Sequence, residues 1–185
     1  NVASVVGYVA GNFEEILNNL LQDFEEKIND QENPLLLQFA LQCIGEIGAF
    51  VDLSGRKDLV DNVFKLIDNQ NREIFNTAAE SIGLLSVGSV NTILPRVLKE
   101  AMKTTDSSVW ILAILSMTKR LSTIDNDKLK LKGNEFETIS EFLVKNADYS
   151  NPTEKSIAES FYYMIKIKPQ EYIKKLINVS KSNKL

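Results

Sequence analysis

The residue types that most often carry out catalysis are scarce in this chain of 185 residues. It contains no histidine, which excludes Ser-His-Asp and Cys-His nucleophiles and metal sites built on imidazole. Its one cysteine, Cys43, lies among Ala40, Ile44 and Ile47 on an apolar helix face, so we expect a packed thiol and not a reactive one. A single cysteine also excludes an internal disulfide, which fits a cytoplasmic or nuclear protein.

Acidic residues occur in two patterns that resemble functional sites without completing them. The adjacent pairs Glu14-Glu15 and Glu25-Glu26 point about 100° apart on a helix, so the carboxyls of one pair cannot share a proton. Asp125-Asn126-Asp127 begins like a calcium-binding loop, but Leu129 stands where a ligand belongs. We therefore expect no catalytic residue, no metal site, no cofactor and no small-molecule substrate.

Several glycines and lysines are spaced in ways that could indicate helix crossings or an anion-binding site. Three glycines, Gly45, Gly48 and Gly83, lie inside helical patterns and follow no strand, so we expect them at helix crossings and not in a phosphate-binding loop. Alternating lysines at 128, 130 and 132 are compatible with a solvated loop or with an anion contact. The net charge of −4 argues against a nucleic-acid partner, and no apolar run reaches the roughly 18 residues that cross a bilayer.

The elements that position these residues follow from a repeated helix. The stretch 71–88 places apolar residues at helical spacing. Related sequences recur at 40–45 and at 158–161, and recurrence every roughly 35–45 residues indicates stacked helix pairs. The sequence predicts an all-α HEAT-repeat solenoid with half-repeats at both ends and about four complete repeats, at 12–51, 55–88, 89–123 and 131–168. Since it begins at Asn1 without a basic leader, we expect an interior piece of a longer array.

Capping residues predict where several of these helices begin and end. Asn33 caps a helix that starts at Pro34 and runs to about Phe50. Further caps are expected at Ser54, at Asp106 and in the capping box 151–154, and Gly88 is the expected C-cap of the helix at 71–88.

One flank of the second helix in each predicted pair carries the candidate protein-binding residues. In three copies this flank is polar, with Gln38 and Gln42, then Asn76 and Glu80, and finally Lys155 and Glu159. The remaining copy instead has Ile111 and Leu115, followed by Lys119. Two interpretations stay open for Ile111 and Leu115: they are covered by the irregular stretch 124–133, or they form an exposed contact patch.

Several blocks of sequence resemble one family of helical repeat proteins. The blocks are LQCIGEIG at 41–48, VDLS at 51–54, AAESIG at 78–83, SVGSV at 86–90 and LPRVLKE at 94–100. In this order they resemble the cullin-associated, neddylation-dissociated proteins, long HEAT-repeat solenoids that wrap cullin scaffolds. The similarity runs from about Ser4 to Leu176 and is to interior repeats of the C-terminal half. Tyr162 departs from it, because the family usually has a glycine there.

The resemblance implies a non-catalytic segment that binds a cullin with its RING subunit and takes part in adaptor exchange. The family's hairpin that blocks the adaptor site, and its region that covers the cullin's modification lysine, lie outside this stretch. The alternative is a general HEAT-repeat scaffold, such as a transport receptor or phosphatase scaffold, whose partner is not a cullin.

Overall fold

The computed structural model describes residues 2–30, 32–104, 106–124, 133–147, 153–170, 172–174 and 177. Over these residues the chain has nine α-helices and one 3-10 helix with defined bounds, further helical residues at 169–170, 172–174 and 177, and no strand. The elements are α1 (Val2–Asn12), α2 (Glu14–Asn29), α3 (Pro34–Gly48), α4 (Lys57–Lys65), η1 (Leu66–Asp68), α5 (Arg72–Gly88), α6 (Ile93–Lys103), α7 (Ser108–Leu121), α8 (Gly133–Lys145) and α9 (Glu154–Ile167). The predicted all-α fold is confirmed.

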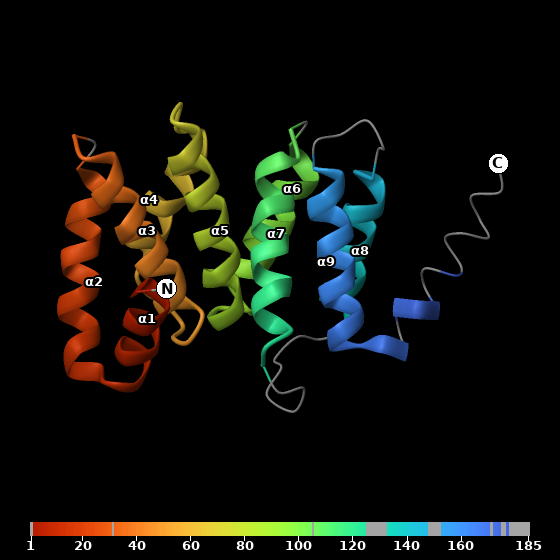
Figure 1. The fold of residues 1–185 in the computed structure, drawn as a ribbon, viewed down its shortest axis with the longest axis horizontal. Coiled ribbons are helices and arrows are strands. Elements are labelled where there is room, and N and C mark those ends of the chain that lie inside the picture. Colours follow the sequence, from red (N-terminus) through yellow and green to blue (C-terminus); the bar gives the residue numbers. More distant parts are fainter. Residues whose placement is uncertain are drawn as a thin grey trace.

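The helices form two layers of a solenoid (Figure 1). The odd-numbered helices contact one another in order from α1 to α9, and we call them the odd layer. The even layer comprises α2, α4, α6 and α8, of which α2 contacts α3 and α4, while α6 contacts α5 and α8. The boundaries of the four repeats stay a prediction, because helix positions alone do not fix where one repeat ends. None of the described helices is both long and apolar enough to span a membrane.

Small residues bring the helices of the odd layer close together. A Cβ added to Gly45 of α3 would lie 2.8 Å from Ser81 Cα of α5, and the Ser81 hydroxyl donates to the Leu41 carbonyl oxygen at 2.8 Å. At the next crossing, a Cβ on Gly83 would overlap the carbonyl oxygen of Ala113 in α7. The predicted role of Gly45 and Gly83 at helix crossings is confirmed.

The predicted N-cap at Asn33 is confirmed, whereas Asp106 lies one residue before the N-cap of α7. The Asn33 side chain accepts a hydrogen bond from the Leu36 backbone N–H at 3.1 Å, so it satisfies a helix donor that has no partner within the helix. Asp106 precedes the N-cap residue of α7, and its carboxylate accepts from the Ser108 backbone N–H at 3.0 Å. Hydrogen bonds from the side chain and backbone of Ser108 lower the pKa of Asp106.

The predicted cap at Ser54 is wrong. The N-cap of α4 is Arg56, which makes no side-chain capping bond, and the Ser54 backbone N–H donates to Asp52 Oδ1 at 2.9 Å. Ser54 therefore belongs to the local turn around Asp52 and lies two residues before the N-cap of α4. Residues 151 and 152 of the predicted capping box lie outside the described residues, and α9 begins after Thr153.

Gly88 is not the C-cap of α5. It is the last helical residue, Ser89 is the C-cap, and no described glycine has a positive φ. The physical reason for a glycine here is close packing, because an added Cβ would overlap the carbonyl oxygen of Gly48 and lie 2.7 Å from that of Val51. Gly88 thus lets the end of α5 lie against the end of α3.

Candidate protein-binding surface

The predicted binding residues, which we call the stripe, lie on four helices of the odd layer: Gln38 and Gln42 on α3, Asn76 and Glu80 on α5, Ile111, Leu115 and Lys119 on α7, and Lys155 and Glu159 on α9. Four of them are exposed, namely Gln42, Glu80, Lys119 and Lys155. Gln38, Asn76, Leu115 and Glu159 are half-buried. A partner could therefore reach eight of the nine residues.

Contacts between neighbouring helices join the first three parts of the stripe. Gln38 Nε2 of α3 donates to Glu73 Oε2 of α5 at 3.2 Å. Between α5 and α7, the positive charge of Lys119 acts on the Glu80 carboxyl. Desolvation by neighbouring atoms raises the pKa of Glu80, and Lys119 offsets part of that effect. Gln38 is thus bonded to α5, and the charges of Glu80 and Lys119 act on each other between α5 and α7.

The α9 part of the stripe has a local ion pair. Lys155 Nζ lies 3.9 Å from Glu159 Oε1 one helical turn away, and the Lys155 side chain is largely exposed. Such a pair is weak in water, so both side chains can exchange partners at little cost. Because α9 contacts α7, these charges extend the surface beyond Lys119.

Ile111 differs from the rest of the stripe because it is fully buried. The corresponding positions in α3 and α5, Gln38 and Asn76, are already half-buried. Ile111 occupies this position in α7, and its apolar side chain is fully enclosed. Leu115, one turn later, remains half-buried. Ile111 presents no surface to a partner in this structure, and residues 125–132 of the stretch expected to cover it lie outside the described residues.

A second group of polar residues in the odd layer was not predicted as a site. Glu46 of α3 accepts from the Ser4 hydroxyl of α1 at 2.8 Å through Oε1. Its Oε2 lies 3.2 Å from Arg120 Nη2 of α7. This contact is an ion pair without hydrogen-bond geometry, since Oε2 is fully enclosed and has no hydrogen-bond partner among the described residues. Glu46 therefore connects three helices of the odd layer.

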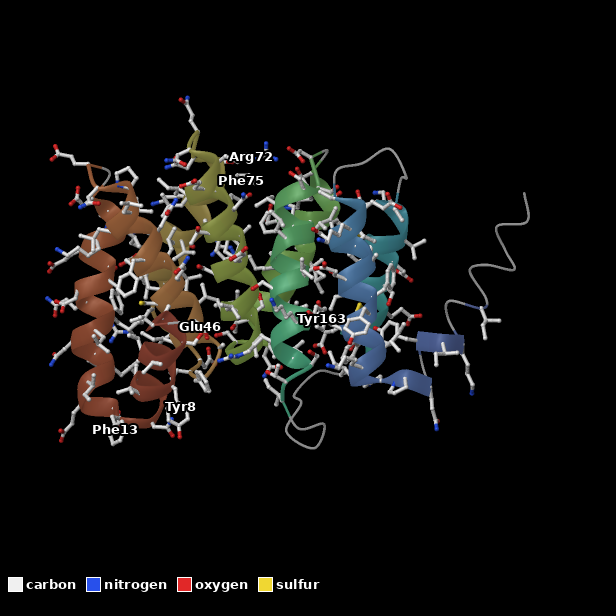
Figure 2. All side chains as sticks on the ribbon, viewed as in Figure 1. Tyr8, Phe13, Glu46, Arg72, Phe75 and Tyr163 are labelled. Atoms are coloured by element: carbon white, nitrogen blue, oxygen red, sulfur yellow. The ribbon has the colours of Figure 1, made fainter. Side chains whose placement is uncertain are left out.

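Two aromatic rings extend this group. The Arg120 guanidinium carbon lies 4.7 Å from the centroid of the Phe50 ring, and Phe50 meets Tyr8 edge-on at a centroid distance of 6.1 Å. Figure 2 shows Glu46 and Tyr8 on neighbouring helices of the odd layer. Because α5 packs between α3 and α7, the Arg120 side chain must reach past α5, which the close helix crossings allow. No local pattern in the sequence reveals this pairing, since its members lie two repeats apart.

Cys43 is a core residue, as the sequence predicts. Its side chain is fully buried beside the Glu46 position of α3. Burial raises the pKa of the thiol to about 11, and the negative charge of Glu46 adds to that shift. The thiolate that reacts with electrophiles is therefore scarce at neutral pH.

The stripe presents a surface suited to binding a protein. Among the described residues, no three cysteine or carboxylate side chains converge as metal ligands. The stripe instead offers amides and charges of both signs on a rigid helical surface, which can form many separate contacts with a protein partner.

The sequence is similar to two proteins that share one name. Over 156 residues, 84% of this chain, it is 27% identical to "Cullin-associated NEDD8-dissociated protein 1" of Dictyostelium discoideum. Over 85 residues, 46% of the chain, it is 32% identical to the protein of that name from Drosophila melanogaster. This chain therefore resembles cullin-associated proteins. The matched segments span 12% and 6% of the two relatives, and no family model matches the sequence.

The Glu46–Arg120 pair is expected to couple α3 to α7 energetically. Both side chains are mostly buried, with 14% and 24% of their surfaces exposed, so solvent screens the pair less than a surface pair. A double-mutant cycle with Glu46→Gln and Arg120→Gln should give a coupling free energy of about 1 kcal/mol in urea unfolding. The same cycle on Lys155 and Glu159 is the control and should give a value near zero. Equal coupling in both cycles would show that Arg120 does not hold Glu46.

Proposed function

We propose that this chain is a protein-binding segment of a solenoid that contacts a cullin scaffold through its odd layer. The similarity to two proteins whose printed name is cullin-associated carries this proposal. The accessible stripe on α3, α5, α7 and α9 supports it, because these side chains form a polar surface across consecutive helices. The contact residues that we assign are Gln38, Gln42, Asn76, Glu80, Leu115, Lys119, Lys155 and Glu159.

The proposed mechanism is steric. A row of helices covers part of the partner, and the affinity is spread over many modest side-chain contacts. We further propose that the partner is a cullin with its RING subunit, that binding influences the exchange of adaptor proteins, and that the segment has no catalytic activity of its own. Cytoplasm or nucleus is the proposed location.

Charge reversal on the stripe should weaken cullin binding. The variant Glu80→Lys with Glu159→Lys changes two carboxylates on α5 and α9, and we expect affinity for a purified cullin–RING complex to fall at least about tenfold. Biolayer interferometry with the immobilised chain measures this change. Circular dichroism and the melting temperature should stay nearly constant, because the substituted side chains lie on the surface.

The matched control reverses two carboxylates on the even layer. Asp23→Lys with Glu26→Lys makes the same change in net charge on exposed positions of α2. If both double variants lose affinity equally, the effect comes from net charge and the stripe is not the contact surface. If the unaltered chain binds no cullin–RING complex, the cullin proposal itself fails and a scaffold for another protein becomes the better interpretation.

A further inference from the structure

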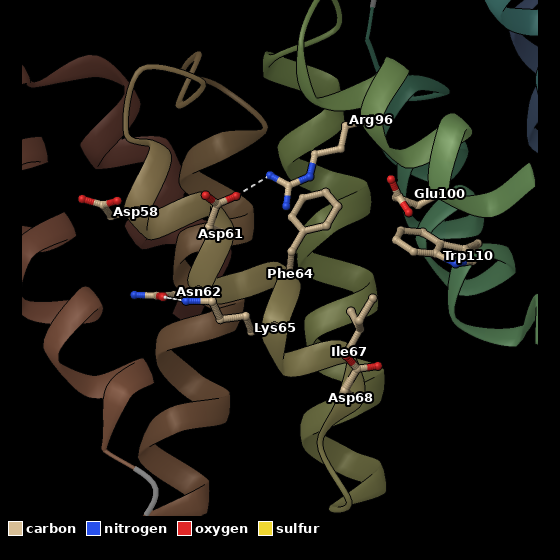
Figure 3. Close-up of a pocket in the computed structure, with 10 residues that line it drawn as sticks. All are labelled: Asp58, Asp61, Asn62, Phe64, Lys65, Ile67, Asp68, Arg96, Glu100 and Trp110. Carbon is tan, nitrogen blue, oxygen red and sulfur yellow. Dashed lines mark hydrogen bonds and ion pairs between the residues drawn. The ribbon is translucent and has the colours of Figure 1, made fainter. Parts of the chain in front are cut away.

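A groove crosses the even layer between α4–η1 and α6, and α7 closes its inner end. It consists of two adjoining hollows of about 480 and 300 Å³. The hollows share Ile67, Asp68, Glu100 and Trp110, so they form one continuous groove. In Figure 3, Phe64, Ile67 and Asp68 project from one wall, while Glu100 and Trp110 belong to the other. This groove shares no residue with the stripe on the odd layer.

The charged residues of the groove favour a cationic ligand. Its lining contains five acidic side chains, Asp58, Asp61, Asp68, Glu100 and Asp106, and three basic ones, Lys65, Arg96 and Lys103. Each basic side chain already has a partner. Arg96 pairs with Asp61 at 2.5 Å and stacks on Phe64, Lys103 pairs with Glu100 at 3.3 Å, and Lys65 donates to Asn62 at 3.2 Å.

Asp68 is the carboxylate best placed to receive a new cation. It is exposed, lines both hollows and makes no ion pair or hydrogen bond with another described residue. Glu100 lies on the opposite wall, and its pair with Lys103 is largely exposed to water. Such a pair contributes little, so Lys103 can release Glu100 to a better-enclosed cation.

Trp110 supplies an independent indication of a ligand. Its side chain is only 4% exposed, and its indole N–H forms no hydrogen bond with another described residue. The N–H is not fully enclosed, and Trp110 lines both hollows of the groove. An indole nitrogen can only donate, so an acceptor atom of a ligand seated in the groove can take the place of the water that otherwise hydrates this N–H.

We propose that this groove binds a basic peptide segment of a partner protein. A lysine or arginine cation lies between Asp68 and Glu100, and a main-chain carbonyl oxygen accepts from Trp110 Nε1. A peptide satisfies both requirements at once, because its side chain brings the cation and its backbone brings the acceptor. The apolar surfaces of Phe64 and Ile67 support the aliphatic part of the side chain.

Trp110 is the only tryptophan of the chain, so its fluorescence reports directly on the groove. The probe is the blocked peptide Ala-Ala-Arg-Ala-Lys-Ala-Ala, and the comparison peptide has glutamine at both charged positions. We expect the basic peptide to change the fluorescence saturably and the glutamine peptide to bind at least about tenfold more weakly. Equal binding of the two peptides would overturn the proposal, and so would the absence of any saturable change.

Variants locate the binding and separate it from general attraction to an acidic protein. Asp68→Asn with Glu100→Gln should weaken the basic peptide about tenfold. Asp23→Asn with Glu26→Gln removes the same charge from α2 and should leave its affinity unchanged. By calorimetry, Trp110→Phe should also bind more weakly, since it lacks the N–H donor. Equal losses in the two charge variants would refute the proposal, and spermidine binding as tightly as the peptide would identify a polyamine site instead.

Discussion

Gly83→Ala is expected to lower the free energy of unfolding by about 2–3 kcal/mol, although alanine is the better helix former. The added methyl would overlap the backbone carbonyl oxygen of Ala113 and lie 3.0 Å from Ser116 Cβ. A backbone carbonyl cannot rotate away as a flexible side chain can, so α5 and α7 must move apart. This separation weakens the contact between two neighbouring helices of the odd layer.

Urea unfolding followed by circular dichroism measures this effect, and the melting temperature should fall by about 5–10 °C. Gly55→Ala is the matched control, because an added Cβ at Gly55 meets no atom within 4 Å and no described glycine has a positive φ. That variant should be neutral or slightly stabilised, since alanine restricts the unfolded chain. An unchanged midpoint for Gly83→Ala would mean that α5 and α7 do not cross closely at this residue.

The helices themselves were predictable because their signals are local. The apolar spacing in 71–88 corresponds to α5 at Arg72–Gly88, and the cap at Asn33 marks the start of α3 within one residue. Both signals depend on residues less than two turns apart, so a single sequence contains them. Gly83 was also placed correctly, because a small residue within an apolar helix face indicates a close crossing.

Other features depend on contacts between distant residues and escaped prediction. A glycine at the end of a helix serves equally as a C-cap or as a close contact, and only the neighbouring Gly48 decides which role Gly88 has. The contacts of Arg120 were also not predictable, because its partners Glu46 and Phe50 come from two repeats earlier in the chain. The place of Trp110 at the groove likewise depends on how α4, η1 and α6 surround it.

The flank of α7 could be predicted only in part from the sequence. Its apolar pattern was recognised at Ile111 and Leu115, but two interpretations of it remained open, because sequence does not give the depth of a position below the surface. The half-burial of Gln38 and Asn76 at the corresponding places shows why Ile111 is enclosed. Leu115, one turn further along, stays accessible and keeps its place in the stripe.

Ile111→Glu is therefore expected to unfold or severely destabilise the chain, by about 4 kcal/mol or more at pH 7.5. Ile111 is fully buried, so an ionised carboxylate there would be withdrawn from water. Leu115→Lys is the matched control. Because Leu115 is half-buried, the lysine stem can cover the same surface while its ammonium group reaches water, and the cost should stay within about 1 kcal/mol.

The pH dependence distinguishes a buried carboxylate from a general loss of packing. Burial raises the pKa of the introduced carboxyl in the folded state above its unfolded value of about 4.3, so the folded state holds its proton more tightly. The destabilisation of Ile111→Glu relative to the unaltered chain should therefore be smaller at pH 4.5 and grow as the pH rises. Ile111→Gln has similar size and no titrating group, so its destabilisation should not vary with pH. If Ile111→Glu unfolds at the same urea concentration as the unaltered chain at pH 7.5, Ile111 faces solvent and belongs with Leu115 in an exposed contact patch.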